Sequence, residues 1–254
     1  MFLKERVEVE TVEVGRVDDR ALLADLYRPP APNGAGVLLV HGGAWIHGDR
    51  SQLRGYGILL GRLGYTSLAC EYRLAPKSKW PAQIDDVNTA LRYLHARAAD
   101  LGIATDKIAV SGNSAGGHLA LMAAATKDSP VAAVIAFYPP TNLVDVRVRV
   151  AEAPDVMSFL MGDDTSEARL AAASPLTFAD ASFPPAMLIT GNDDEIVDWH
   201  ESQAMYSKLM EAGAHAELHV FEGAPHAFDA RPKFGRQCAS LMGLFLDRFV
   251  LGAD

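Results

Sequence analysis

The stretch IAVSGNSAGGHLALMAAA, residues 108–125, decides the fold. Its first four residues are an apolar run that predicts a short buried strand, and Leu119 to Ala125 predict a helix. Between them, Gly112-Asn113-Ser114-Ala115-Gly116 has the Gly-x-Ser-x-Gly spacing of a nucleophile elbow, a tight strand-to-helix turn that exposes a serine at the top of a sheet. We expect only glycine to fit on either side of the serine, because the chain turns so sharply there.

Outward from the elbow, the sequence alternates between strand and helix patterns. Buried strands are predicted at 37–40, 66–72, 131–138, 186–190 and 216–221, and helices at 84–99, 199–211 and 234–250. Earlier, residues 7–14 alternate with period two and predict a hairpin with 21–27 around Asp18-Asp19. Antiparallel strands followed by βα units predict a single α/β domain over residues 1–254, with a mostly parallel, doubly wound sheet.

The composition excludes several classes of protein. Of the 254 residues, 49% are hydrophobic and 22% are charged, which is ordinary for a globular protein. A net charge of −9 disfavours binding to the phosphate backbone of nucleic acids. Neither a signal peptide nor a run of about 20 apolar residues is visible, so we expect a cytoplasmic protein that does not bind membranes. The cysteines, Cys70 and Cys238, lack metal-site spacing, and nothing indicates a metal or organic cofactor.

Residues 142–172 form an insertion longer than an ordinary connection between a strand and the next βα unit. It contains the apolar cluster Val156-Met157-Ser158-Phe159-Leu160-Met161. Because it follows a predicted strand, it could form a small lid over the carboxyl ends of the strands, where ligands of open α/β sheets bind. A surface helix packed on the body of the protein is the other possibility, and the sequence leaves both open.

Four loops with reactive or flexible residues follow predicted strands, and these loops should meet at one edge of the sheet. A serine hydroxyl needs a base to become a nucleophile, and the base needs a carboxylate to orient it. Proteins with this elbow carry the three groups in the order Ser, Asp or Glu, His. Ser114, Asp194 and His226 satisfy that order. Asp193 is the alternative carboxylate.

Acyl transfer also needs fixed donors for the tetrahedral oxyanion. The backbone N–H of Ala115 is one candidate, because it lies at the start of the elbow helix. The pair Gly42-Gly43 follows the strand at 37–40 and lets backbone N–H groups turn toward the same point. We therefore expect Gly43 and Ala44 to supply the remaining donors.

Taken together, these motifs resemble the α/β-hydrolase carboxylesterases of the hormone-sensitive-lipase-like group and their bacterial feruloyl-esterase-like relatives. The resemblance runs from about Ala21 to Val250, and it rests on HGGAW (41–45), YRLAP (72–76), WPA (80–82) with Asp85-Asp86, and GNSAGGH (112–118). It implies an α/β-hydrolase fold, and an acyl-enzyme mechanism with Ser114, Asp194 and His226 as nucleophile, acid and base. It also implies oxyanion donors at Gly43, Ala44 and Ala115.

The expected substrate is a small, short-chain carboxylic ester, because the short N-terminal region leaves little room for the helical cap of many relatives. We expect Trp45, and Met157, Phe159 and Leu160 of the insertion, to contact this substrate.

Two residues depart from the family pattern, and two other functions stay open. Ala44 stands where a third glycine is usual, and Asn113 stands where aspartate or histidine is commoner. Kynurenine-formamidase-like enzymes share the His-Gly-Gly-x-Trp loop and a similar elbow, and they cleave an aryl formamide. A non-catalytic binding scaffold on the same fold is the alternative of a different class, although the intact Ser114, Asp194 and His226 argue against it.

Overall fold

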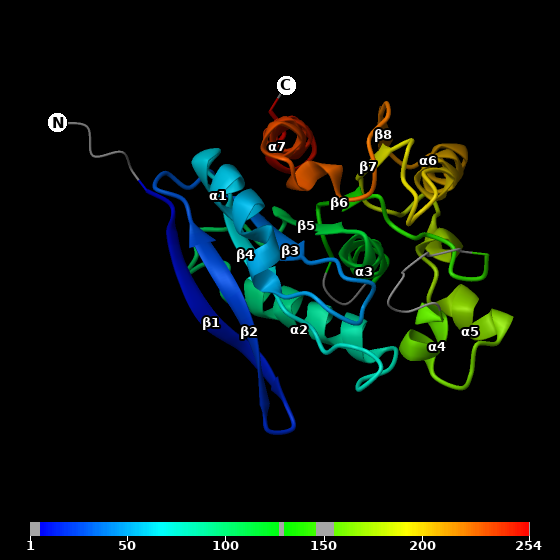
Figure 1. The fold of residues 1–254 in the computed structure, drawn as a ribbon. Helices are drawn as coiled ribbons and strands as arrows, with labels where there is room; N and C mark the ends of the chain where they lie inside the picture. Colours follow the sequence, from blue (N-terminus) through cyan, green and yellow to red (C-terminus); the bar gives the residue numbers. More distant parts are fainter. Residues whose placement is uncertain (1–5, 127–129, 146–154, 254) are drawn as a thin grey trace.

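The computed structural model describes residues 6–126, 130–145 and 155–253, and Figure 1 shows their arrangement. Within these ranges, eight strands form one sheet in the order β1-β2-β4-β3-β5-β6-β7-β8. β1 (Glu8–Val17) and β2 (Arg20–Arg28) form an antiparallel hairpin, and β2 also pairs antiparallel with β4 (Thr66–Cys70). All the other neighbouring pairs, from β4–β3 to β7–β8, are parallel. The remaining strands are β3 (Gly36–Val40), β5 (Ile108–Asn113), β6 (Ala133–Phe137), β7 (Ala186–Gly191) and β8 (Ala216–Phe221). The predicted α/β architecture, a mostly parallel sheet with an N-terminal antiparallel hairpin, is confirmed.

Helices cover both faces of the sheet, and alternate strand residues point into the two resulting layers. Leu38 and Val40 of β3 lie in the same apolar layer as buried residues of α2 (Ala82–Ala96), α3 (Ala115–Ala124) and α6 (His200–Ala212). Val37 and Leu39 lie in the opposite layer with buried residues of α1 (Arg54–Arg62) and α7 (Pro232–Leu246), two helices toward the top of the view in Figure 1. The continuous apolar runs of the central strands therefore reflect burial on both faces. None of the helices in the described ranges has the length and apolar character that crossing a bilayer demands.

Helix α1 has no counterpart among the elements predicted from the sequence. Its sequence contains Gly55, Gly57 and Gly61, and glycine destabilises a helix interior by about 1 kcal/mol relative to alanine. Two of these glycines are required by packing. A Cβ on Gly57 would lie 2.6 Å from the ring of Tyr27, and one on Gly61 would lie 2.8 Å from Val7. Tertiary contacts thus stabilise a helix that local propensity disfavours.

The insertion at 142–172 is described except for residues 146–154, which lie outside the described part of the chain. Its described part contains two short helices, α4 (Val156–Met161) and α5 (Glu167–Ala172), seen at the lower right of Figure 1. The amide of Trp80 donates to the carbonyl of Leu160 at 2.8 Å, and Arg169 donates to the carbonyl of Trp80 at 3.2 Å. The insertion is therefore docked on the loop that precedes α2.

Candidate active site

The elbow places Ser114 between β5 and α3 in a strained conformation. Its φ and ψ are 55° and −120°, a region that costs a residue other than glycine about 1–3 kcal/mol. A Cβ on Gly112 would lie 2.2 Å from the carbonyl oxygen of Gly116, and a Cβ on Gly116 would lie 2.1 Å from that of Val40. Glycine is therefore needed on both sides of the serine, because strand, turn and helix backbones approach too closely for a side chain.

Ser114, His226 and Asp194 are joined by two hydrogen bonds. His226 Nε2 lies 3.0 Å from Ser114 Oγ, and His226 Nδ1 lies 2.7 Å from Asp194 Oδ2. Since an ionised carboxylate can only accept, the Nδ1 proton is donated to Asp194, which leaves Nε2 free to accept from the serine hydroxyl. The Asp194 side chain is fully buried, whereas that of His226 is 17% exposed. The pair is thus shielded on the aspartate side and open on the serine side.

The backbone after β7 decides which aspartate reaches the histidine. Asp194 Oδ1 accepts hydrogen bonds from the amides of Ile196 and Val197, at 2.8 and 2.9 Å. These bonds turn the other carboxylate oxygen toward His226. Asp193 is exposed, and its amide donates to the carbonyl of Ala224 at 3.2 Å.

In the described ranges, no three His, Cys, Asp or Glu side chains gather closely enough to hold a metal ion.

The loop after β3 passes against the elbow. A Cβ on Gly42 would lie 2.8 Å from the carbonyl oxygen of Asn113 and 3.5 Å from Ser114 Cβ. The next residues, Gly43 and Ala44, have φ values of 117° and 51°. Among the hydrogen bonds between described residues, none has the amide of Gly43 or Ala44 as its donor. Ala115, the first residue of α3, has no intrahelical acceptor for its amide either. All three predicted oxyanion donors therefore have N–H groups available at this edge of the sheet.

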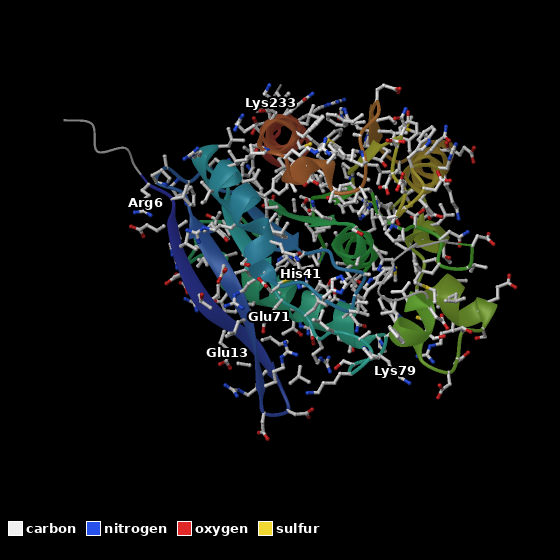
Figure 2. The ribbon with its side chains drawn as sticks, viewed as in Figure 1. Arg6, Glu13, His41, Glu71, Lys79 and Lys233 are labelled. Carbon is white, nitrogen blue, oxygen red and sulfur yellow. The ribbon has the colours of Figure 1, made fainter. Side chains whose placement is uncertain are left out.

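The motif at 72–76, which the sequence offered only as a family marker, supports this loop. The ring of Tyr72 stacks on His41 with centroids 4.2 Å apart, and its hydroxyl donates to the His41 carbonyl at 3.0 Å. Burial lowers the pKa of His41 and keeps it neutral; Figure 2 labels this residue near the centre of the molecule. Arg73 is held in turn by Asp86 through two bonds of 2.8 Å, one from Nε and one from Nη2.

The four residues expected to contact substrate differ in accessibility. Trp45 is fully buried, and its indole Nε1 donates to His118 Nδ1 at 3.3 Å, so it anchors the loop in the core instead of facing a substrate. Leu160 is also fully buried in the apolar layer. Met157 is half-buried, and Phe159 is 37% exposed. Of the four side chains, only Met157 and Phe159 are therefore accessible from outside.

His118 joins the elbow helix to two other segments. Its Nδ1 accepts from Trp45, and its Nε2 lies 2.7 Å from the carbonyl of Ala173, just after α5. The ring is also 5.5 Å from that of Trp80. Both bonds require a neutral imidazole with its proton on Nε2, and burial lowers the pKa of His118 to about 4.

We expect the protein to lose stability in mild acid through His118. Between the usual pKa of 6.5 and the lowered value of about 4, the unfolded chain binds a proton that the folded chain does not. Over this window the free energy of unfolding should fall by about 3 kcal/mol as the pH is lowered. Urea unfolding at several pH values from 7 to 5 measures the slope. His118→Gln should flatten it relative to the wild type, and His200→Gln at an exposed histidine should not. An unchanged slope in His118→Gln would contradict the assignment.

Comparisons with known proteins add to this geometry. The BD-FAE family model matches residues 24–209. Esterase LipC of Mycobacterium tuberculosis is 30% identical over 239 residues, which cover 84% of this chain and 58% of the relative. This chain spans 54–58% of the length of LipC and two further curated relatives from that organism.

Two solved structures show the same fold. An arylesterase superposes with a TM-score of 0.82 at 27% identity, over 95% of this chain and 85% of the other. The esterase Est2 of Thermogutta terrifontis, solved with propionate bound, has a TM-score of 0.78 at 27% identity, over 95% and 94% of the two chains.

Proposed function

Because this chain belongs to the BD-FAE family, within the α/β-hydrolase fold, we propose that it is a serine carboxylesterase that hydrolyses short-chain carboxylic esters. The observation that carries the proposal is the pair of hydrogen bonds that joins Ser114 Oγ to His226 and His226 to Asp194, at 3.0 and 2.7 Å. The esterase and arylesterase names of its relatives support a carboxylic ester as the substrate.

In the proposed reaction, His226 Nε2 takes the proton of the Ser114 hydroxyl while Oγ bonds to the ester carbonyl carbon. Asp194 stabilises the imidazolium that forms. As the tetrahedral intermediate collapses, the C–O bond to the alcohol breaks and His226 returns its proton to the leaving oxygen. His226 then takes a proton from a water molecule while the water oxygen bonds to the acyl carbon. When the bond from this carbon to Ser114 Oγ breaks, His226 returns the proton to Oγ and the carboxylic acid leaves.

The developing oxyanion is proposed to accept hydrogen bonds from the amides of Gly43, Ala44 and Ala115. Their N–H groups are fixed by the backbone before substrate arrives, so no reorganisation is needed in the transition state. Ala44 adopts a left-handed conformation that glycine would adopt at lower cost. The side chain adds a methyl group without removing the amide donor.

We expect kcat/KM to be highest for acyl chains of two to about six carbons. A longer chain gains about 0.8 kcal/mol per buried methylene only where apolar walls bury it. In the insertion, only Met157 and Phe159 of the expected contacts are accessible to form such walls. The propionate in the related Est2 structure agrees with a short acyl group. Hydrolysis of p-nitrophenyl esters of graded acyl length measures kcat/KM against chain length. N-formylkynurenine is included as a substrate to test the alternative formamidase activity.

A matched pair of variants tests the acyl-length argument. Phe159→Ala should reduce kcat/KM most for the longest of the preferred esters. Leu244→Ala removes an exposed apolar side chain from α7 and should leave the profile unchanged. A maximum at twelve or more carbons, roughly where burial of a long chain dominates, would show that a deep acyl tunnel exists and that the substrate class is wrong.

A further inference from the structure

A buried carboxylate outside the proposed triad lies in the segment that follows the proposed catalytic histidine. Asp229, which is 7% exposed, follows His226 by three residues. Its carboxylate accepts from the hydroxyl of Tyr56 at 2.9 Å, from Asn113 Nδ2 at 2.7 Å, and from the hydroxyl of Tyr138. Among the ion pairs of the described residues, none includes Asp229. A buried carboxylate held only by neutral donors is costly to desolvate, so a reason for its presence is needed.

These donors connect the two segments that carry the nucleophile and the base. Asn113 directly precedes Ser114, and Asp229 belongs to the loop that carries His226. The Asn113–Asp229 bond therefore joins the same two segments as the Ser114–His226 bond. Tyr138 adds a second support, because its ring centroid lies 4.5 Å from that of His226 while its hydroxyl is held by Asp229.

In this cluster (Asp229, Asn113, Tyr138 and Tyr56), one charged acceptor is surrounded by three neutral hydrogen-bond donors. Asn113 presents a neutral N–H donor at 2.7 Å, where a second carboxylate would force one of the two acids to bind a proton. Burial, together with the charge of Asp229, raises the pKa of both Tyr138 and Tyr56, so both hydroxyls keep their protons and donate. Asn113 is therefore suited to its place beside the Asp229 carboxylate, since its side chain can donate without adding a second negative charge.

We propose that Asp229 is a positioning residue that holds His226 within proton-transfer distance of Ser114 through Asn113 and Tyr138. The inference rests on the proposed esterase function, and it adds a group that does not touch substrate. Proton transfer is sensitive to this distance, because a misplacement of about 1 Å can lower the rate about 10²-fold.

The test separates positioning from folding by counting active sites. Each variant is titrated with an organophosphonate that labels the nucleophilic serine, and kcat is expressed per labelled site. For Asp229→Asn we expect kcat per site to fall about 10- to 100-fold with KM changed less than about threefold. A merely structural residue would lower the number of labelled sites and the melting temperature, but not kcat per site. Tyr138→Phe, which removes one hydroxyl, should show a smaller loss of the same kind.

Exchange of the two side chains provides the rescue. Asn113→Asp alone places two carboxylates together and should lower kcat per site. The double variant Asn113→Asp/Asp229→Asn rebuilds the donor–acceptor pair in reverse, and should recover at least about tenfold over Asp229→Asn alone, since residues in contact are not additive. Tyr65→Phe is the matched control, because Tyr65 also donates its hydroxyl to an aspartate, Asp247, at the end of α7.

Each outcome decides a different point. Wild-type kcat per site in Asp229→Asn, or a double variant no better than either single variant, would overturn the positioning role while the esterase proposal stands. A wild-type protein that is not labelled at Ser114 and hydrolyses no ester would overturn the proposed function, and the positioning role with it.

Discussion

Replacement of Ser114 by alanine is expected to lower kcat for ester hydrolysis by about 10⁴-fold or more. The substitution removes the only atom proposed to bond to the acyl group, and it leaves the oxyanion donors and the binding surface in place. Folding should be unaffected, because alanine carries the same Cβ in the strained elbow and loses only one hydroxyl. Steady-state kinetics on p-nitrophenyl acetate and a thermal unfolding curve measure the two effects.

Organophosphonate labelling provides the control for that result. Label should be lost from Ser114→Ala and kept in Ser240→Ala, which removes an exposed hydroxyl from α7. Ester hydrolysis near the wild-type rate in purified Ser114→Ala would show that another group is the nucleophile. If Ser114→Ala loses the folded state as well as the activity, the experiment is repeated with Ser114→Cys. This variant should be labelled by a thiol reagent.

Conversion of Asp194 to asparagine is expected to lower kcat about 10⁴-fold through the tautomer of His226. In the wild type, one carboxylate oxygen accepts from the amides of Ile196 and Val197, and the other accepts from His226 Nδ1. An asparagine would keep its carbonyl on the two amides and turn its NH₂ group toward Nδ1. The imidazole proton would then lie on Nε2, and a protonated Nε2 cannot accept the proton of the serine hydroxyl.

The neighbouring aspartate is the matched control for this prediction. Asp193→Asn makes the same change of charge one residue away on an exposed side chain, and kcat should stay within about twofold, because an exposed charge contributes little to the site. A pH–rate profile for Asp194→Asn should show that activity recovers in part at high pH. A severe defect in Asp193→Asn with a mild one in Asp194→Asn would show that the carboxylate assignment is off by one residue.

Local sequence patterns were sufficient for the order of the strands, for the elbow with Ser114, and for the two loops that carry the proposed base and carboxylate. Continuous apolar runs predicted the central strands, because strands buried on both faces exclude polar residues. Glycines around Ser114 predicted the elbow, since backbone crowding there admits no side chain. The loops with Asp194 and His226 follow consecutive strands, and parallel strands bring their carboxyl ends to one edge. Each of these inferences depends on residues close together in the sequence.

Other features depend on residues that are far apart in the sequence, and they leave no periodic signal. Helix α1 exists because Gly57 and Gly61 let it approach Tyr27 and Val7, although the same glycines weaken the local helix pattern. Trp45 was expected to contact the substrate, but its side chain is fully buried and donates a hydrogen bond to His118. Asn113 and Asp229 are 116 residues apart in the sequence. The residues next to each of them do not indicate that the two side chains form a hydrogen bond.

What the sequence could determine and what it could not are separated by the distance along the chain between the interacting residues. The sequence by itself determined the strands, the elbow and the order of the reactive loops, because burial on a face and tight turns are set by neighbouring residues. Only the tertiary structure decided which aspartate faces His226, which aromatic side chains are buried, and which polar groups pair beneath the site. Those choices depend on contacts of a few ångströms between distant segments, and hydrogen-bond partners are selected by geometry that no local pattern encodes.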